Sequence, residues 1–205
     1  MKKVIIVLAI LVLAFCTVFF ATDLFKPERI LEGAEASKLA SEAYLDILIN
    51  IKEYPNGKNV DAKLLEAAMR IARELELIKD EDTPYYREYV PKETVHLIIE
   101  ELTGKPVKEP IKVEDFDYLY DEEKDYYYIV PVGTDWIRYN EIKNVLEKGH
   151  YYEVICDADL TDYDGIPITS YENMVIKLKK VSDNRYIRYR IESISAGNSI
   201  EAENK

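Results

Sequence analysis

The chain lacks the cysteine content of a disulfide-rich or thiolate metal-binding protein. Its 205 residues contain two cysteines, Cys16 and Cys156, and the first lies inside an apolar N-terminal run. Cys156 is therefore alone in the rest of the chain, where it can form no internal disulfide. One thiolate also supplies too few ligands for a zinc site. We expect a body that folds without a disulfide or a cysteine-bound metal.

Histidine, the usual catalytic base, is equally scarce. The sequence has two, His96 and His150, and contains no Gly-x-Ser-x-Gly, His-Glu-x-x-His or Cys-x-x-Cys motif. His96 and Glu100 are four residues apart on a predicted helix, where a pair of surface residues is the simpler interpretation than two metal ligands. Cys156 lies among aliphatic residues of a predicted strand, where a free cysteine packs as a small hydrophobe. We therefore predict no catalytic residue, no metal site and no cofactor.

Positive charge is the third shortage. The chain has 27 Lys and Arg against 39 Asp and Glu, which gives a formal net charge of -12. No stretch rich in Lys or Arg offsets this excess locally. Such a chain repels phosphate backbones. We predict no nucleic-acid partner, and we expect the body to be a poor partner for anionic lipid.

The start of the chain has the pattern of an export segment. Lys2 and Lys3 precede a run over residues 4–22 that carries no charge before Asp23. A helix over that run is about 28 Å long, close to the hydrocarbon thickness of a bilayer. The flanking charges place the N-terminus in the cytoplasm. We predict that residues 1–25 form an export signal or a membrane anchor and deliver the rest of the chain to the extracytoplasmic side.

Three fates of this segment stay open. Signal peptidase prefers small residues one and three positions before the cut, and Ala21 meets the first requirement while Phe19 does not meet the second. Leu13-Ala14-Phe15-Cys16 resembles a bacterial lipoprotein box, with Phe15 where a small residue is required. The segment is thus a retained anchor, a cleaved signal or a lipidation site at Cys16.

Residues 30–104 have the 3.6-residue periodicity of helices. The predicted helices cover residues 36–51, which end before Pro55-Asn56-Gly57, residues 61–78, with Asp61 as the N-cap, and residues 91–104, from Pro91 to a stop at Gly104. A polar connector over residues 79–89 separates the second helix from the third. We expect the third helix to bury Val95, Ile98, Ile99 and Leu102.

From residue 111 the periodicity changes to two, which is typical of strands. The predicted strands are residues 116–120, 126–132, 137–146 and 151–159, one around Met174, Ile176 and Leu178, and one around Ile187, Tyr189 and Ile191. Helices followed by five or six antiparallel strands make an α+β domain. Its helical part is residues 30–104, its sheet part is 111–195, and residues 196–205 form a loose tail. We expect the sheet to be a curved meander around the third helix.

This order of elements resembles the cystatin-like and nuclear-transport-factor-like domains of exported Gram-positive bacterial proteins. The resemblance is carried by the helix at residues 91–104, the Tyr126-Tyr127-Tyr128 strand and the hairpins of residues 151–193. It covers about 100 residues. It implies a cone between helix and sheet that binds a small ligand or a partner, often without catalysis.

Carboxylates gather at two predicted hairpins. Asp115, Asp117, Asp121, Glu122, Glu123 and Asp125 flank the first, and Asp157, Asp159, Asp162 and Asp164 flank a later one. Calcium prefers several oxygens on one loop. The second cluster fails the helix-loop-helix calcium pattern, because Asp162 stands where glycine is required and Ile168 where a glutamate belongs. Solvated turns are the simpler interpretation, while a calcium ion near residues 157–164 and a hydrolase that uses these carboxylates stay alternatives.

Tyrosine is the most distinctive component, with 17 residues beside a single tryptophan. Because successive side chains of a strand point to opposite faces, at least one ring of Tyr126-Tyr127-Tyr128 faces away from the core. Trp136 follows Gly133-Thr134-Asp135 in a predicted loop. Exposed aromatic rings bind sugar rings or protein partners. We therefore predict a ligand-binding surface that includes Tyr128 and Trp136.

Together these patterns indicate a non-catalytic, extracytoplasmic binding or regulatory domain that is membrane-anchored or secreted. Its predicted partner is a cell-envelope protein, a peptide or a glycan, and the membrane is contacted through the N-terminal helix. A cell-wall hydrolase that uses the acidic residues, and a structural membrane-proximal spacer, are the alternatives.

Overall fold

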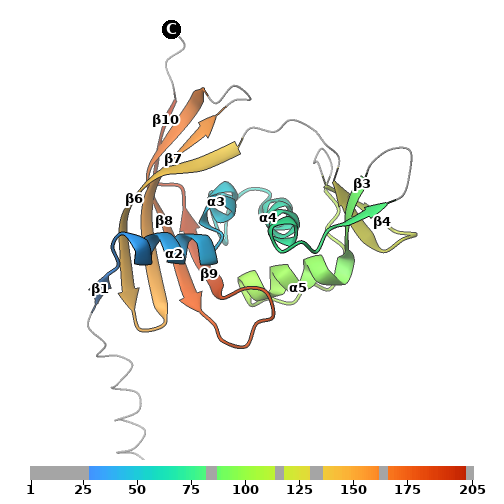
Figure 1. Ribbon diagram of the computed structural model, residues 1–205. Coiled ribbons are helices and arrows are strands. Elements are labelled where there is room, and N and C mark those ends of the chain that lie inside the picture. The colour runs from blue at the N-terminus through green and yellow to red at the C-terminus, as the bar shows by residue number, and fades with distance from the viewer. Residues whose placement is uncertain (1–27, 82–86, 114–117, 130–135, 162–165, 202–205) are drawn as a thin grey trace, which may run out of the picture.

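The protein is an α+β structure in which helices separate two antiparallel sheets (Figure 1). The computed structural model describes residues 28–81, 87–113, 118–129, 136–161 and 166–201. The predicted export segment, residues 1–25, lies outside these ranges. Among the helices within them, none has both the length and the hydrophobicity of a membrane span.

The first predicted helix is interrupted. The helical elements are α2 (Ala34–Glu42), α3 (Leu45–Leu48), the short 3-10 helix η1 (Ile49–Ile51), α4 (Val60–Glu74) and α5 (Lys92–Thr103). One continuous helix over residues 36–51 was the wrong prediction, because Tyr44 has a φ of 53° that separates α2 from α3. A left-handed residue cannot continue a helix. The apolar spacing continues across Tyr44, so the pattern hides the break.

The other two helices follow the prediction more closely. α4 begins after Asn59 rather than after a cap at Asp61. It ends at Glu74, short of the predicted residue 78, and the positive φ of Glu76 (56°) turns the chain away. α5 ends where predicted, at Gly104, whose φ of 70° is a left-handed conformation that glycine adopts without strain.

The strands form a large sheet and a small sheet. The large sheet contains β1 (Arg29–Ile30), β6 (Trp136–Lys148), β7 (Tyr151–Thr161), β8 (Pro167–Lys180), β9 (Tyr189–Ser195) and β10 (Asn198–Glu201). The small sheet contains β2 (Lys79–Glu81), β3 (Arg87–Pro91), β4 (Tyr118–Asp121) and β5 (Tyr126–Ile129). The strand orders are β1-β6-β7-β8-β10, with β9 also on β8, and β2-β3-β5-β4.

The single predicted meander is therefore wrong. β4 and β5, expected as its first two strands, form a separate sheet with β2 and β3, in which β5 pairs with β3. β2 and β3 come from the region predicted as a polar connector. The local pattern could not reveal them, because β3 pairs with β5 and the whole of α5 separates these two strands in the sequence. Residues 198–201 of the predicted loose tail also pair, as β10, with β8.

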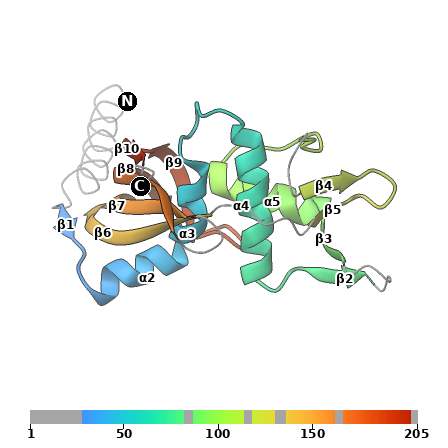
Figure 2. The same ribbon diagram turned by 90° about the horizontal axis from the view of Figure 1, so that it is seen from above.

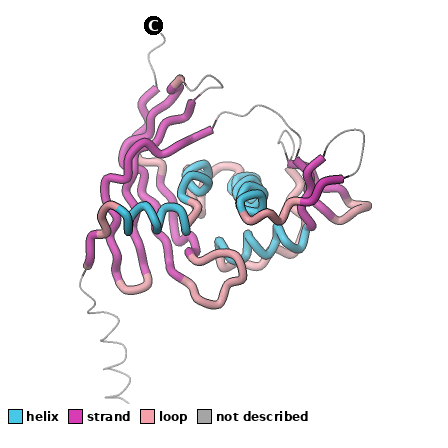
Figure 3. Tube along the Cα trace, viewed as in Figure 1, coloured by secondary structure: helices cyan, strands magenta, loops and turns pink. Residues whose placement is uncertain are grey.

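α3, α4 and α5 lie between the two sheets rather than inside one curved sheet (Figure 3). Seen from above, β1 and the small sheet lie at opposite ends of the molecule, with α4 and α5 between them (Figure 2). α5 does not run through a cone of the large sheet. It contacts β9 of that sheet and also β3 and β5 of the small sheet, so it bridges the two.

One face of the large sheet supplies most of the core. Along β7, every second residue from Tyr152 to Ala158 is buried. The four residues of α5 predicted to be buried are at most 2% exposed, which confirms that expectation. His96, which was expected near the polar edge of the helix, is buried with 8% exposure. α5 therefore carries a titratable group into the space beneath the small sheet.

A candidate binding surface on the small sheet

The outer face of the small sheet carries a row of side chains across all four strands. Tyr89 of β3 lies opposite Lys79 of β2 on one side and opposite Tyr128 of β5 on the other. Leu119 of β4 is the partner of Tyr128. Side chains of directly paired residues share one face of a sheet. We call Lys79, Tyr89, Leu119, Tyr126 and Tyr128 the aromatic face.

The tyrosine rings of the aromatic face are packed together. The rings of Tyr89 and Tyr126 stack with centroids 4.6 Å apart, and Tyr128 meets Tyr126 edge-on at 6.4 Å. Lys124 places its Nζ 5.4 Å from the centre of the Tyr126 ring. Tyr126 is buried by these neighbours, while Tyr89 and Tyr128 stay partly exposed. The result is a flat, amphipathic surface that sugar rings or apolar peptide side chains can contact.

The inner face is fixed by a buried tyrosine. Tyr127 points the opposite way from its two neighbours and is fully buried. Its hydroxyl accepts the Ile111 N–H at 2.7 Å and lies 3.2 Å from Nε2 of His96. Because this hydroxyl already accepts an N–H, its own proton is available to Nε2 of a neutral imidazole. The bonds join β5, α5 and the segment that leads to β4.

Burial has opposite effects on the two members of this pair. Desolvation raises the pKa of Tyr127 and lowers the pKa of His96, because it disfavours a charge on either ring. The nearby ammonium of Lys92 lowers the His96 pKa further, while Glu100 and Asp125 oppose the shift. Both groups are therefore held in their neutral forms, which suits a structural support and not proton transfer.

A second polar cluster holds the turn between β4 and β5. Asp125 forms an ion pair with Lys92 at 2.6 Å and accepts the Tyr120 hydroxyl proton at 2.5 Å. The hydrogen bond from Lys92 is the largest influence that lowers the Asp125 pKa. Asp121 accepts the backbone N–H groups of Glu123 and Lys124 at 3.0 and 3.1 Å. Asp121 and Asp125 of the first acidic cluster therefore secure the hairpin, while Glu122 pairs with Lys112.

The two predicted site residues are not brought together in one sheet. Tyr128 lies in the small sheet, and Trp136 is the first residue of β6 in the large sheet, paired with Thr161. The expectation that Trp136 lies in a loop was wrong. Its side chain is outside the described part of the structure. The residues that accompany Tyr128 are instead Tyr89 and Tyr126.

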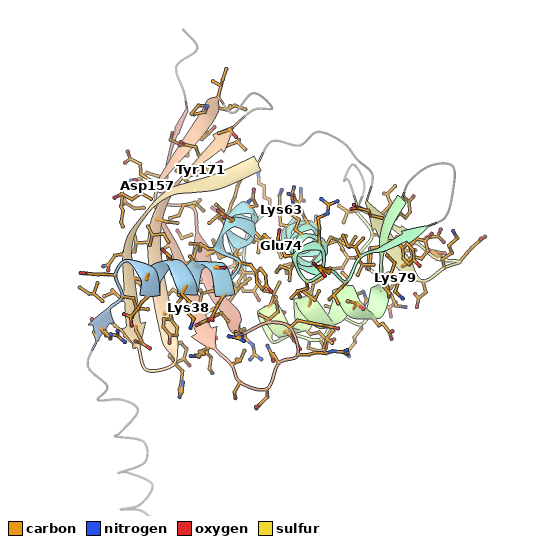
Figure 4. All side chains as sticks on the ribbon, in the orientation of Figure 1. Lys38, Lys63, Glu74, Lys79, Asp157 and Tyr171 are labelled. Atoms are coloured by element: carbon orange, nitrogen blue, oxygen red, sulfur yellow. The ribbon has the colours of Figure 1, made fainter. Side chains whose placement is uncertain are left out.

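Asp157, in the second acidic cluster, has a structural role. It lies at an irregularity of β7, where the register with β8 shifts between Cys156 and Ala158. Its carboxylate pairs with Lys143 at 2.7 Å and accepts the Asn173 N–H at 2.9 Å. Both contacts lower the Asp157 pKa, the Lys143 hydrogen bond most. Figure 4 places Asp157 and Lys79 on opposite sheets.

No three His, Cys, Asp or Glu side chains gather into a possible metal site among the residues that the structure describes. Residues 162–165 of the predicted calcium loop lie outside them. Cys156 is fully buried, and burial raises the pKa of its thiol to about 11. A cysteine nucleophile needs a histidine beside it, and His150 is exposed at the β6–β7 turn. Thiolate chemistry between these two residues therefore has no support in the geometry.

An open groove of about 830 Å³ lies between the start of α4 and residues 105–113. It is lined by Tyr54, Pro55, Val60, Pro106, Val107 and Pro110, among others. Lys105 lies over the Tyr54 ring, with its Nζ 5.5 Å from the ring centre. Tyr128 does not line this groove, so the predicted binding residue lies outside it.

The sequence predicted an outward ring in the strand of Tyr128, and it did not reveal that Lys79, Tyr89 and Tyr126 lie on the same face. The available signal was the alternation of Tyr89 and Val90, which is too short to identify a strand without its partner. No family model, curated protein or solved structure matches the chain. The resemblance to cystatin-like and nuclear-transport-factor-like domains therefore stays a prediction from the order of elements.

Proposed function

We propose that this protein is a non-catalytic binding or regulatory module of the extracytoplasmic space. Its N-terminal segment holds it in the membrane or is removed after export. Its partner is a component of the cell envelope, which is a protein, a peptide or a glycan. The observation that carries this proposal is the aromatic face, because it presents packed and partly exposed tyrosine rings on the outer face of the small sheet.

The position of the aromatic face supports this role. The described chain begins at β1, immediately after the predicted export segment, and the small sheet lies at the other end of the molecule (Figure 2). A partner can therefore reach Tyr89 and Tyr128 without approaching the point of attachment. Tyrosine is well suited to such a surface, since it offers a large contact area at low cost in side-chain entropy.

The two alternative functions, a cell-wall hydrolase and a structural spacer, make different predictions. A hydrolase needs carboxylates that are free to act, whereas Asp125 and Asp157 are each held by a lysine and a second hydrogen-bond donor. A structural spacer needs no partner at all, so substitutions on the aromatic face would change nothing outside the protein. Of the three hypotheses, only a binding module predicts a partner whose binding depends on the tyrosines of the aromatic face.

The experiment uses the full-length chain with a C-terminal tag in the cells that produce it. Added protease should digest the body in spheroplasts but not in cells with an intact envelope. This result would place the body on the outer side of the cytoplasmic membrane. Envelope components captured with the wild type are then compared with those of Tyr89→Ala and Tyr128→Ala. We expect at least about a tenfold loss of the captured component, because truncation of a central aromatic contact weakens binding that much.

Tyr151→Ala is the matched control, because Tyr151 is an exposed tyrosine (49%) on the large sheet. It should capture the component as the wild type does, and all three variants should keep the wild-type circular dichroism spectrum. Equal capture by every variant would remove the aromatic face from the proposal. A body that resists protease in spheroplasts would remove the extracytoplasmic role.

A further inference from the structure

A basic pocket lies at the end of the large sheet that carries β1. It is a hollow of about 460 Å³ where the β6–β7 turn, the end of β8, the loop after β8 and β9 meet. Its lining includes His150, Lys179, Lys180, Asp183, Asn184 and Arg190. Three of these side chains are permanently cationic and one is anionic. The chain as a whole has a net charge of -12, so this pocket is a local exception.

Arg190 is the fixed element of the basic pocket. Its guanidinium packs flat against Gly104, since a Cβ at that glycine would lie 2.8 Å from Cζ of Arg190. Gly104, with its φ of 70°, ends α5, and the negative end of a helix favours a nearby cation. The Nε of Arg190 is buried and has no hydrogen-bond partner among the described residues. The structure therefore holds a rigid cation whose donors are not all satisfied.

In the described part of the chain, three other cations at this end of the sheet form ion pairs, unlike those of the pocket. Arg29 pairs with Glu35, Lys148 with Glu28, and Arg188 with Glu42. Within the described ranges, neither Lys180 nor Arg190 has an ion-pair partner among the salt bridges of the structure. Lys179 lies over the Tyr151 ring at 5.4 Å. Uncompensated positive charge around one hollow favours an anionic ligand.

The location of the basic pocket indicates the source of that anion. β1 pairs with the end of β6, and Glu28 lies 2.5 Å from Lys148 across this edge. Residue 28 therefore sits beside the turn that contains His150. Figure 1 shows β1, that turn and the β8–β9 loop at the same end of the large sheet. If the export segment stays in the bilayer, as the proposed function allows, this end faces the lipid head groups.

Two large side chains that do not line the pocket are exposed at the same end of the large sheet. Tyr151 is 49% exposed and follows His150, and Ile30 of β1 is 58% exposed. Tyrosine and aliphatic side chains beside cations are typical of protein segments at head-group level. The sequence gives no sign of this arrangement, because residues 150, 179–180 and 190 are brought together only by the pairing of β7, β8 and β9.

We propose that the basic pocket binds a phosphate group, with the Arg190 guanidinium and the Lys180 ammonium as its donors. Arginine and lysine are the side chains that recognise phosphate oxygens, arginine through two parallel N–H groups. Two sources share this chemistry, namely the phosphodiester of an anionic lipid head group and free inorganic phosphate. The inference about the lipid source rests on the proposed function, whereas the phosphate chemistry does not.

The test measures the dissociation constant of the full-length chain in neutral detergent micelles. One titration adds phosphatidylglycerol, a second adds phosphatidylcholine, and a third adds inorganic phosphate. We expect saturable binding of phosphatidylglycerol that is lost about tenfold or more in Arg190→Gln and in Lys180→Gln, because each removes a charged hydrogen-bond donor. Lys180 is exposed, so its variant keeps the test valid if Arg190→Gln fails to fold.

Lys177→Gln is the matched control, since Lys177 is an exposed lysine of β8 that pairs with Glu153 outside the pocket. It changes the net charge equally and should bind as the wild type does. Equal losses of affinity in Arg190→Gln, Lys180→Gln and Lys177→Gln would mean nonspecific electrostatic attraction and would overturn the proposal. An affinity that neither pocket variant changes would overturn it too. Binding of inorganic phosphate without phosphatidylglycerol would keep the phosphate site and reject the lipid source. The protease result in spheroplasts is independent of all these outcomes.

Discussion

The two sheets of this protein are built on different principles. Three strands of the large sheet are 11 to 14 residues long, and they bury a continuous aliphatic face. The strands of the small sheet have 3 to 5 residues. Their inner face depends on tyrosine and on polar bonds to α5. A sheet of such short strands cannot bury enough apolar surface to be stable by itself. Hydrogen bonds to α5 must therefore provide part of its stability.

The same contrast divides α5 into two ends. Its C-terminal end holds the large sheet through Glu101, which is 7% exposed. The Glu101 carboxylate accepts the backbone N–H groups of Arg185, Tyr186 and Ile187 at 2.6 to 3.0 Å. Its N-terminal end holds the small sheet through the contact between His96 and Tyr127 and the ion pair between Lys92 and Asp125. The two junctions should therefore differ in strength.

The largest effect is expected at the large-sheet junction, from Glu101→Ala. The substitution leaves three backbone N–H groups of the β8–β9 loop without their acceptor. We expect the free energy of unfolding to fall by about 3 to 5 kcal/mol, since each such donor costs on the order of 1 to 3 kcal/mol and water replaces part of the loss. Urea denaturation of the full-length chain in neutral detergent measures this change.

The control for this variant is Glu93→Ala, on the exposed face of the same helix. It removes a carboxylate from the first turn of α5 and should change stability by no more than about 1 kcal/mol. A loss for Glu101→Ala as small as that of the control would show that the carboxylate does not secure the loop. The proposed difference between the two ends of α5 would then disappear.

A smaller effect is expected at the small-sheet junction, from Tyr127→Phe. The ring stays in place, while the hydroxyl that accepts the Ile111 N–H and contacts His96 is lost. We expect a loss of about 1 to 2 kcal/mol. Hydrogen exchange should sharpen the comparison, because amides of β3 and β5 should exchange faster while those of β7 and β8 do not.

Tyr151→Phe serves as the control, because no hydrogen bond of the Tyr151 hydroxyl is found in the described structure and the ring is half exposed. Its stability should match that of the wild type. If Tyr127→Phe speeds exchange equally in both sheets, the small sheet does not open by itself. The division of the molecule into an aliphatic and a hydrogen-bonded part would then be wrong.

The same contrast explains what the sequence could reveal. Apolar and polar side chains alternate along the long strands. This pattern predicted β7 and the part of β8 around Met174, Ile176 and Leu178. The class, α+β with helices before most strands, followed from that pattern. The small sheet was missed because β2 and β3 are short and their partner β5 lies beyond α5. Tyr44 was missed for a different reason, since a backbone dihedral leaves no trace in apolar spacing.

The candidate sites follow the same rule. Tyr128 was predicted because three consecutive tyrosines must place one ring outward, which is a local property of any strand. Its neighbour Tyr89 depends on the register of β3 with β5. The basic pocket depends on the register of three strands and on the end of α5. Features that need only one segment could be predicted, and features assembled from several could not.

The smallest expected effect is a pH dependence of stability that belongs to the small-sheet junction. Burial lowers the pKa of His96 in the folded protein, and the Lys92 ammonium adds to this effect. The unfolded chain therefore binds a proton at His96 more readily, with a pKa near 6.5. Between the lowered pKa and 6.5, the unfolded state carries more protons, so stability rises with pH in that window and is lost as the pH falls through it.

One proton limits the slope to about 1.4 kcal/mol per pH unit. Urea denaturation of the full-length chain at a series of pH values between about 5 and 7.5 measures it against the reference pKa of histidine. His96→Gln should abolish the slope, while His150→Gln, at the exposed turn, should retain it. The sequence has no third histidine, so the two variants together account for imidazole titration. A slope that survives unchanged in His96→Gln would mean that another group causes it, and a slope of opposite sign would mean that burial does not lower the His96 pKa. Either result would contradict the expectation that the buried imidazole beneath the small sheet sets this pH dependence.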